Sequence, residues 1–267
     1  MDQIIAELKK IPPVTRFVCV STAGMTISVM MQLLDPKHIL YFHPWVWGKF
    51  QLWRVPSSFF LASTNINFVF EMAMLYRNLN QIETGHFLNK SSDLAWQMLF
   101  VAGSIIVATR PVGSIIFLHP LLASLTYVSS ALAPPGAQTS LMGLVTLPVT
   151  YFPYVMVALD FLMAGPERAA EAVAGLVVGH MWWWSVWGGS LGSQGVLAQY
   201  GQAPQWLRNF FGEGGRPRPP AAPRGNATGG AAAGLRAAGI EVVPPRRAAN
   251  AEPEGHQWGV GNRLGSS

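Results

Sequence analysis

The residues that could do chemistry stand out because the chain around them is apolar. Residues 55–76 carry few charges but include Asn65, Asn67 and Glu71. Polar groups are costly in hydrocarbon unless they face protein or water. We predict that Asn65 and Glu71 line a wet groove where a polypeptide backbone finds hydrogen-bond partners, while Asn67 could equally bond a neighbouring helix. A second interpretation makes Glu71 an end-of-span residue that pairs with Arg77 or extends outward.

Nucleophilic catalysis is the other chemistry to consider, because it needs a hydroxyl or thiol beside a base. Ser114 and Ser129 lie in a long apolar region, and His180 follows later in the chain. We expect Ser129 to pack in the core and His180 to form an interfacial or interhelical hydrogen bond. The single cysteine, Cys19, excludes an internal disulfide and a cysteine-rich zinc site. We expect neither a metal nor a cofactor.

The composition indicates a membrane protein. The chain is 50% hydrophobic and 12% charged, about half the roughly 25% charge of a soluble domain. Nucleic acid is not expected as a partner. The charge-poor stretches are Phe17–Leu34, Val55–Tyr76, Leu94–Thr109, residues 111–159 and Glu171–Trp184.

These stretches predict an all-α polytopic membrane protein with six transmembrane helices in residues 1–211. Residues 111–159 are too long for one helix and are broken by Ala133-Pro134-Pro135-Gly136. Leu94–Thr109 falls short of a hydrocarbon layer of about 30 Å, which predicts local thinning of the bilayer. Six spans place both termini on one side, and the basic residues ahead of the first span favour the cytosol.

Two glycines in the sixth span, Gly175 and Gly179, are four residues apart. Small residues at this spacing allow two helices to approach closely in lipid. We predict packing within the chain. The alternative is a dimer face, so the chain could form a homo- or hetero-oligomer.

The C-terminal segment, residues 212–267, is rich in Gly, Ala and Pro and has few large apolar residues. Such a composition cannot offset chain entropy by burial, so we predict a disordered tail. One large aromatic residue stands out near its end and indicates a short linear binding motif at residues 256–265. The candidate anchors are Trp258, Gly259, Gly261, Arg263 and Leu264.

The loop between the first two spans is aromatic and contains Lys49 and Arg54. We predict that it lies in the membrane interface, with the rings at headgroup level and the basic heads in water. Its last residues, Trp53-Arg54, resemble the WR motif of the rhomboid superfamily. Together with further residues they resemble the derlin family over residues 1–211. Those residues are Ile11-Pro12, Thr15-Arg16, Leu75-Tyr76-Arg77, Glu83-Thr84-Gly85, Phe87, Asp93, Gly175-x-x-x-Gly179-His180 and Pro204-Gln205-Trp206-Leu207.

The resemblance implies a rhomboid-like arrangement of the six spans. Rhomboid proteases use a G-x-S-G serine on span four and a histidine on span six. Here Ser114 is followed by Ile115, and His180 follows Gly179 instead of preceding the glycine pair. The resemblance therefore implies a pseudoprotease without catalytic residues. The alternatives are an active intramembrane serine protease and a small-solute transporter, which would show two similar halves with broken helices.

The same resemblance implies a role in endoplasmic-reticulum-associated degradation. Derlins help to move misfolded proteins from the endoplasmic reticulum to the cytosol, so the implied location is that membrane, with both termini cytosolic. Residues 256–265 resemble the SHP box that binds the valosin-containing AAA ATPase. The implied partners are misfolded proteins, this ATPase and an endoplasmic-reticulum ubiquitin-ligase complex.

Overall fold

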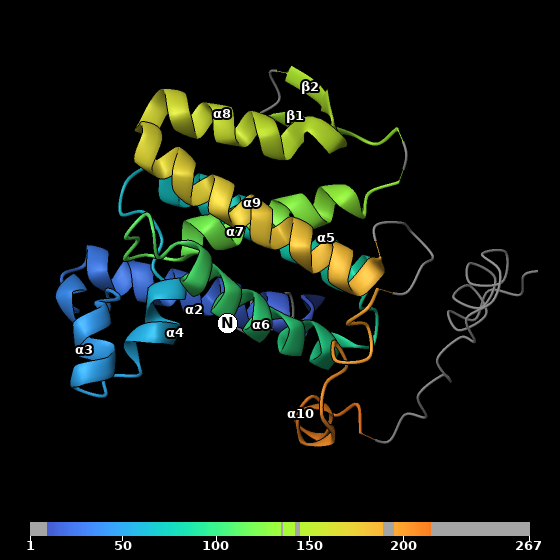
Figure 1. Ribbon diagram of the computed structural model, residues 1–267, viewed down its shortest axis with the longest axis horizontal. Helices are drawn as coiled ribbons and strands as arrows, with labels where there is room; N and C mark the ends of the chain where they lie inside the picture. Colours follow the sequence, from blue (N-terminus) through green and yellow to red (C-terminus); the bar gives the residue numbers. More distant parts are fainter. Residues whose placement is uncertain (1–9, 135, 142–144, 189–194, 215–267) are drawn as a thin grey trace, which may run out of the picture. The chain divides into compact units, whose positions relative to one another are not determined.

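The computed structural model describes residues 10–134, 136–141, 145–188 and 195–214 (Figure 1). The chain divides into two units, Met1–Pro219 and Pro220–Ser267, and every described residue belongs to the first. The predicted disordered tail, from residue 215 onward, and the predicted binding motif at 256–265 lie outside the described residues.

The described part is mostly helical. The longer helices are α2 (Pro13–Met30), α5 (Asn67–Gly85), α6 (Ser91–Ala108), α7 (Leu118–Ala131), α8 (Phe152–Ala164) and α9 (Pro166–Trp187). The short elements are η1 (Pro36–His38), α3 (His43–Gly48), α4 (Arg54–Phe59), β1 (Gln138–Leu141), β2 (Val145–Pro148), η2 (Val149–Tyr151) and α10 (Gln205–Phe210).

The prediction of an all-α chain is wrong at one place, where β1 and β2 form an antiparallel hairpin before α8 (Figure 1). Gln138 pairs with Pro148 and Leu141 with Val145. This segment is rich in β-branched residues, which favour extended backbone. The fifth predicted span, in the second half of residues 111–159, is therefore a hairpin followed by the 13-residue helix α8.

The second predicted span, Val55–Tyr76, is not one helix. α4 ends at Phe59 and α5 begins at Asn67. Between them lies a loop whose amide groups bond to side chains from elsewhere, since Ala62 N–H donates to Thr26 Oγ1 at 3.0 Å. Polar residues in the loop also compete with helical backbone bonds. Because of this break, α5 is not a continuation of α4, and the position of its first residue is not fixed by α4.

Helix lengths differ from the predicted spans. α2 and α6 are the described helices whose length and apolar composition suffice to cross a membrane. α6 has 18 residues, about 27 Å, so it is longer than predicted. The short helices are instead α7, with 14 residues, and α8, with 13, each about 20 Å long.

Helix α7 lies at the centre and packs against α5, α8 and α9. Leu75, Leu94, Leu125 and Val128 are fully buried in the core that these helices share with α6. The chain reverses between α8 and α9 at Gly165, which adopts a φ of 90°. Side-chain-bearing residues rarely adopt this conformation, so glycine permits the tight connection.

Candidate functional site

The two residues of the WR motif have different environments. Trp53 is 58% exposed, whereas Arg54, the first residue of α4, is 2% exposed. The Arg54 guanidinium donates from Nε to Gln51 Oε1 at 2.6 Å. Its Nη1 donates to the carbonyl oxygens of Lys37 at 2.6 Å and Leu40 at 2.9 Å. Arg54 therefore holds the loop of residues 37–51 against the start of α4.

The prediction that the basic head of Arg54 stays in water is wrong. The loop carbonyls replace water as its hydrogen-bond acceptors, and Trp45 covers the guanidinium carbon at 4.9 Å from the ring centroid. Exposed aromatic rings remain on the loop, with Trp45 at 42% and Phe50 at 78%. Arg54 is therefore buried, whereas aromatic rings of the loop, which were predicted to lie at the interface, are exposed.

Replacing Arg54 with lysine is expected to lower the free energy of unfolding by about 2 kcal/mol. A lysine keeps the charge but cannot bond to three acceptors in the geometry of a planar guanidinium. The measurement is thermal unfolding of the detergent-solubilised chain. Trp53→Phe, at the exposed neighbour, is the control and should change stability by less than about 0.5 kcal/mol. Equal effects of the two substitutions would contradict a specific role for the guanidinium.

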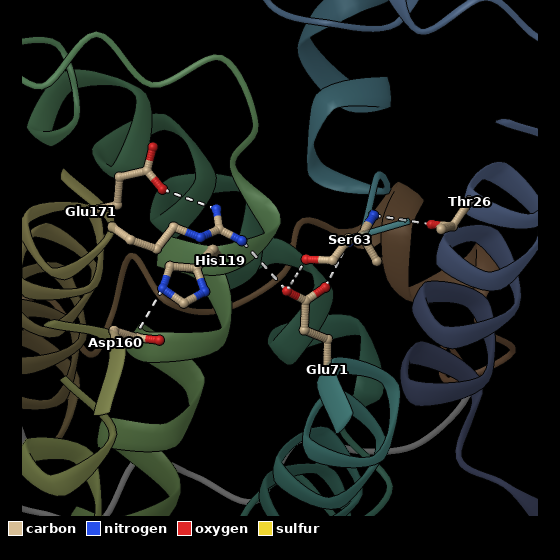
Figure 2. A network of polar contacts seen from close by, with 8 residues as sticks. Thr26, Ser63, Glu71, His119, Asp160 and Glu171 are labelled. Atoms are coloured by element: carbon tan, nitrogen blue, oxygen red, sulfur yellow. Dashed lines mark hydrogen bonds and ion pairs between the residues drawn. The ribbon is translucent and has the colours of Figure 1, made fainter. Parts of the chain in front are cut away.

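A network of polar contacts surrounds Glu71, in the first turns of α5 (Figure 2). Its Oε2 accepts the Ser63 N–H at 2.8 Å and its Oε1 accepts the Ser63 hydroxyl at 2.7 Å. Arg168 Nη2 lies 3.6 Å from Glu71 Oε1, and Arg168 Nη1 donates to Glu171 Oε2 at 3.2 Å. The Glu71 carboxylate therefore joins the loop between α4 and α5 to the start of α9.

The same end of the helices holds a second polar contact. His119 Nε2, in the first turn of α7, lies 3.1 Å from Asp160 Oδ2 of α8 (Figure 2). Arg168, rather than Arg77, is the basic partner of Glu71, so the predicted pairing of Glu71 with Arg77 is wrong. The reason is that the break before α5 brings Glu71 to the end of the bundle where α9 begins.

Asn65 and Asn67 do not join this network. Asn65, in the loop before α5, and Asn67, the first residue of α5, have exposed side chains that form no hydrogen bond with another described residue. Glu71, in contrast, is 8% exposed. The structure therefore does not bring the three predicted groove residues together, and the groove stays a prediction.

Gly175 and Gly179 lie at the crossing of α9 and α7. A Cβ atom at Gly175 would stand 2.2 Å from Pro120 O, and one at Gly179 would stand 2.8 Å from Ser124 O. The absent side chains thus let the two helix backbones approach within the chain. The structure shows this intramolecular packing directly.

The candidate nucleophiles do not meet His180. The His180 ring bonds through Nδ1 to Tyr127 OH at 2.6 Å. Ser129 Oγ donates to Thr126 O at 3.0 Å and lies 3.2 Å from Asn78 Oδ1. Ser114 Oγ is buried with no hydrogen-bond partner among the described residues.

A buried acid that sequence reasoning did not assign holds the start of α2. Glu83, near the end of α5, accepts the N–H groups of Val14 at 3.1 Å and Thr15 at 2.8 Å, and the Thr15 hydroxyl at 2.7 Å. α2 begins after Pro12 without a side-chain cap of its own. That missing local cap is the sequence signal that a partner elsewhere must bond these amides.

The segment that leads toward the tail is fixed to the start of α6. The Glu213 carboxylate accepts both the N–H and the hydroxyl of Ser92. Asp93 Oδ1 accepts the Ala203 N–H at 2.7 Å, and Gln97 Nε2 donates to Gly201 O at 2.9 Å. The point at which the chain leaves the helices is therefore set by the first turns of α6.

Two helices long and apolar enough to cross a membrane, α2 and α6, and a close glycine crossing are typical of a helical, membrane-associated protein. The chain belongs to the Der1-like family, whose sequence profile matches residues 11–198. It is 32% identical over 176 residues to Derlin-1 of Oryza sativa subsp. japonica, covering 65% of this chain and 72% of the relative. It is 29% identical over 205 residues to Derlin-1.2 of Zea mays, covering 76% and 82%. It is 25% identical over 182 residues to the probable derlin-2 homolog of Dictyostelium discoideum, covering 66% and 71%.

Proposed function

We propose that this chain is a non-catalytic component of endoplasmic-reticulum-associated degradation that helps to retrotranslocate misfolded proteins to the cytosol. Its membership of the Der1-like family supports this role. A valosin-containing-protein type AAA ATPase supplies the force, and an endoplasmic-reticulum ubiquitin-ligase complex modifies the emerging substrate. The SHP-box motif at residues 256–265 is the proposed ATPase contact.

In the proposed topology, six spans cross the endoplasmic reticulum membrane in a rhomboid-like arrangement and both termini are cytosolic. The spans are α2, α4 with α5, α6, α7, α8 and α9. This topology places the Arg54 loop, the Glu71–Arg168 contact and the His119–Asp160 contact together at the lumenal end. The hairpin and the segment from Gly201 to Glu213 then lie at the cytosolic end.

The observation that carries the proposal is the interrupted second span. The loop between α4 and α5 and the first residue of α5 expose Thr64, Asn65 and Asn67, which would offer hydrogen-bond partners to a substrate backbone inside the bilayer. α7 and α8, each about 20 Å long, are too short for a hydrocarbon layer of about 30 Å. A thinned bilayer beside polar groups lowers the cost of moving a polar chain across.

The absence of catalysis is part of the same proposal. The bond from His180 Nδ1 to Tyr127 OH and the helical bonds of Ser129 leave these two residues with other partners. A rhomboid protease would need one of the serines to donate to this imidazole. Neither the protease alternative nor the transporter alternative is favoured by a contact among the described residues.

The double substitution Trp258→Ala, Arg263→Ala is expected to abolish co-purification of the AAA ATPase with the detergent-solubilised chain. In a short binding motif, an isolated tryptophan and the guanidinium of an arginine carry most of the binding free energy. The matched control is Leu235→Ala, Arg236→Ala, which removes one apolar residue and one arginine elsewhere in the tail. Equal recovery of the ATPase with wild type and the motif variant would contradict the proposed contact.

A further inference from the structure

A cavity of about 180 Å³ lies between the second half of α5, the end of α7, the hairpin and the start of α8. A cavity of this size holds several water molecules or a small polar group. The residues that matter for its chemistry are Arg77, Gln81, Ser129, Thr139 and Phe152. None of them belongs to the Glu71 network or to the glycine crossing.

Arg77 is the charged residue of the cavity wall. Its Nη1 donates to Thr139 Oγ1 at 2.9 Å, and its guanidinium carbon lies 4.9 Å from the centroid of the Phe152 ring. Its Nε is buried and has no hydrogen-bond partner among the described residues. No carboxylate of a described residue pairs with Arg77. A buried guanidinium N–H without a hydrogen-bond partner is unfavourable unless a ligand accepts from it.

Three main-chain carbonyl groups of the cavity wall already accept hydrogen bonds. Ser129 O accepts from Gln81 Nε2 at 3.5 Å, Ser130 O accepts the Ala133 N–H at 3.3 Å, and Pro134 O accepts the Ala137 N–H at 3.1 Å. Thr139 Oγ1 accepts from Arg77, so its own proton is free to be donated. Arg77 Nε and the Thr139 hydroxyl are therefore unused donors beside the one charge of the described wall, a cation, and the matching ligand is an anionic acceptor.

We propose that this cavity binds a phosphate group, supplied by the headgroup of a membrane phospholipid. The Arg77 guanidinium and the Thr139 hydroxyl provide the donors for the phosphate oxygens. α7 ends at Ala131 and α8 begins at Phe152, so the cavity lies where two membrane helices end, at headgroup level. Tyr151 and Tyr154, close in sequence to the lining residue Phe152, have exposed rings, as is typical of a membrane–water boundary.

The proposal rests on the membrane location alone and not on ATPase coupling. The probe is dihexanoyl phosphatidylglycerol, added to the detergent-solubilised full chain and counted as bound adducts by native mass spectrometry. Inorganic phosphate and dihexanoylglycerol, which lacks the phosphate, are the comparison ligands. We expect adducts with phosphatidylglycerol, none with dihexanoylglycerol, and little competition from inorganic phosphate.

Two substitutions test the donors. Arg77→Gln and Thr139→Val are each expected to weaken phosphatidylglycerol binding about tenfold or more, because each removes a donor to an anion. Thr146→Val, on the exposed face of β2, is the matched control and should bind like wild type. Thr139→Val keeps Arg77, so it tests the site even if Arg77→Gln unfolds the chain.

Other outcomes would overturn the proposal. Equal binding by wild type and Thr139→Val would place the lipid elsewhere. Binding of dihexanoylglycerol as tightly as phosphatidylglycerol would make the cavity an apolar groove. Full competition by inorganic phosphate would retain the phosphate chemistry but assign it to a soluble ligand.

Discussion

Substitution of Gly175 by alanine is expected to lower the free energy of unfolding by about 3 kcal/mol, a large loss for one methyl group. The new Cβ atom would stand 2.2 Å from Pro120 O and 2.9 Å from Ala123 Cβ. The first of these atoms is backbone, so α7 and α9 must separate. Overpacking of this kind costs about 1–3 kcal/mol in cores and more where backbone must move.

The control for this prediction is Gly103→Ala, the same chemical change in the middle of α6. No atom lies within 4 Å of a Cβ built at Gly103. Alanine there should raise stability slightly, since it forms helices better than glycine by up to about 1 kcal/mol. Gly179→Ala should fall between the two, because its nearest contact would be 2.8 Å.

Thermal unfolding in detergent, followed by tryptophan fluorescence, measures all three variants. If the glycine pair were instead a dimer face, Gly175→Ala would change the oligomeric mass and leave the stability of the monomer intact. A monomer as stable as wild type would therefore contradict close packing within the chain.

The positions of most helices follow from the sequence because charge-poor length is a local property. The third span illustrates this, since Leu94–Thr109 predicts most of α6. The glycine spacing likewise predicts a close helix approach without knowledge of the partner. Both predictions depend only on residues within one helix. The structure contains helix α6 and a close approach of α7 to the two glycines.

The break before α5 could not be predicted from the sequence. Its loop amides bond to Thr26, in α2, and to Glu71, whose second partner is Arg168. The contacts with Thr26 and Arg168 join residues far apart in the chain, and nothing in the local sequence of residues 55–76 indicates them. The same holds for Arg54, whose acceptors are main-chain carbonyls of a loop that must first fold.

Removal of the Glu83 carboxylate is expected to have an effect as large as that at the glycine crossing. Val14 is 4% exposed and Thr15 is fully buried, so water cannot replace the carboxylate as acceptor for their N–H groups. Glu83→Ala should lower the free energy of unfolding by about 4 kcal/mol, because buried donors are left unsatisfied. Glu83→Gln should lower the free energy of unfolding by about half as much. Its amide oxygen can still accept a hydrogen bond, but its NH₂ group is a donor and cannot accept from the second N–H group.

Glu167→Gln is the matched control, because Glu167 is an exposed acid in the first turn of another helix, α9. An exposed charge at a helix start stabilises by less than about 1 kcal/mol. Unfolding of the full chain in detergent compares the three variants. The carboxylate joins the end of α5 to the start of α2, so exchange of the Val14 and Thr15 amide hydrogens should quicken in both Glu83 variants and stay unchanged in Glu167→Gln. Unchanged exchange at both amides would show that α2 begins without this cap.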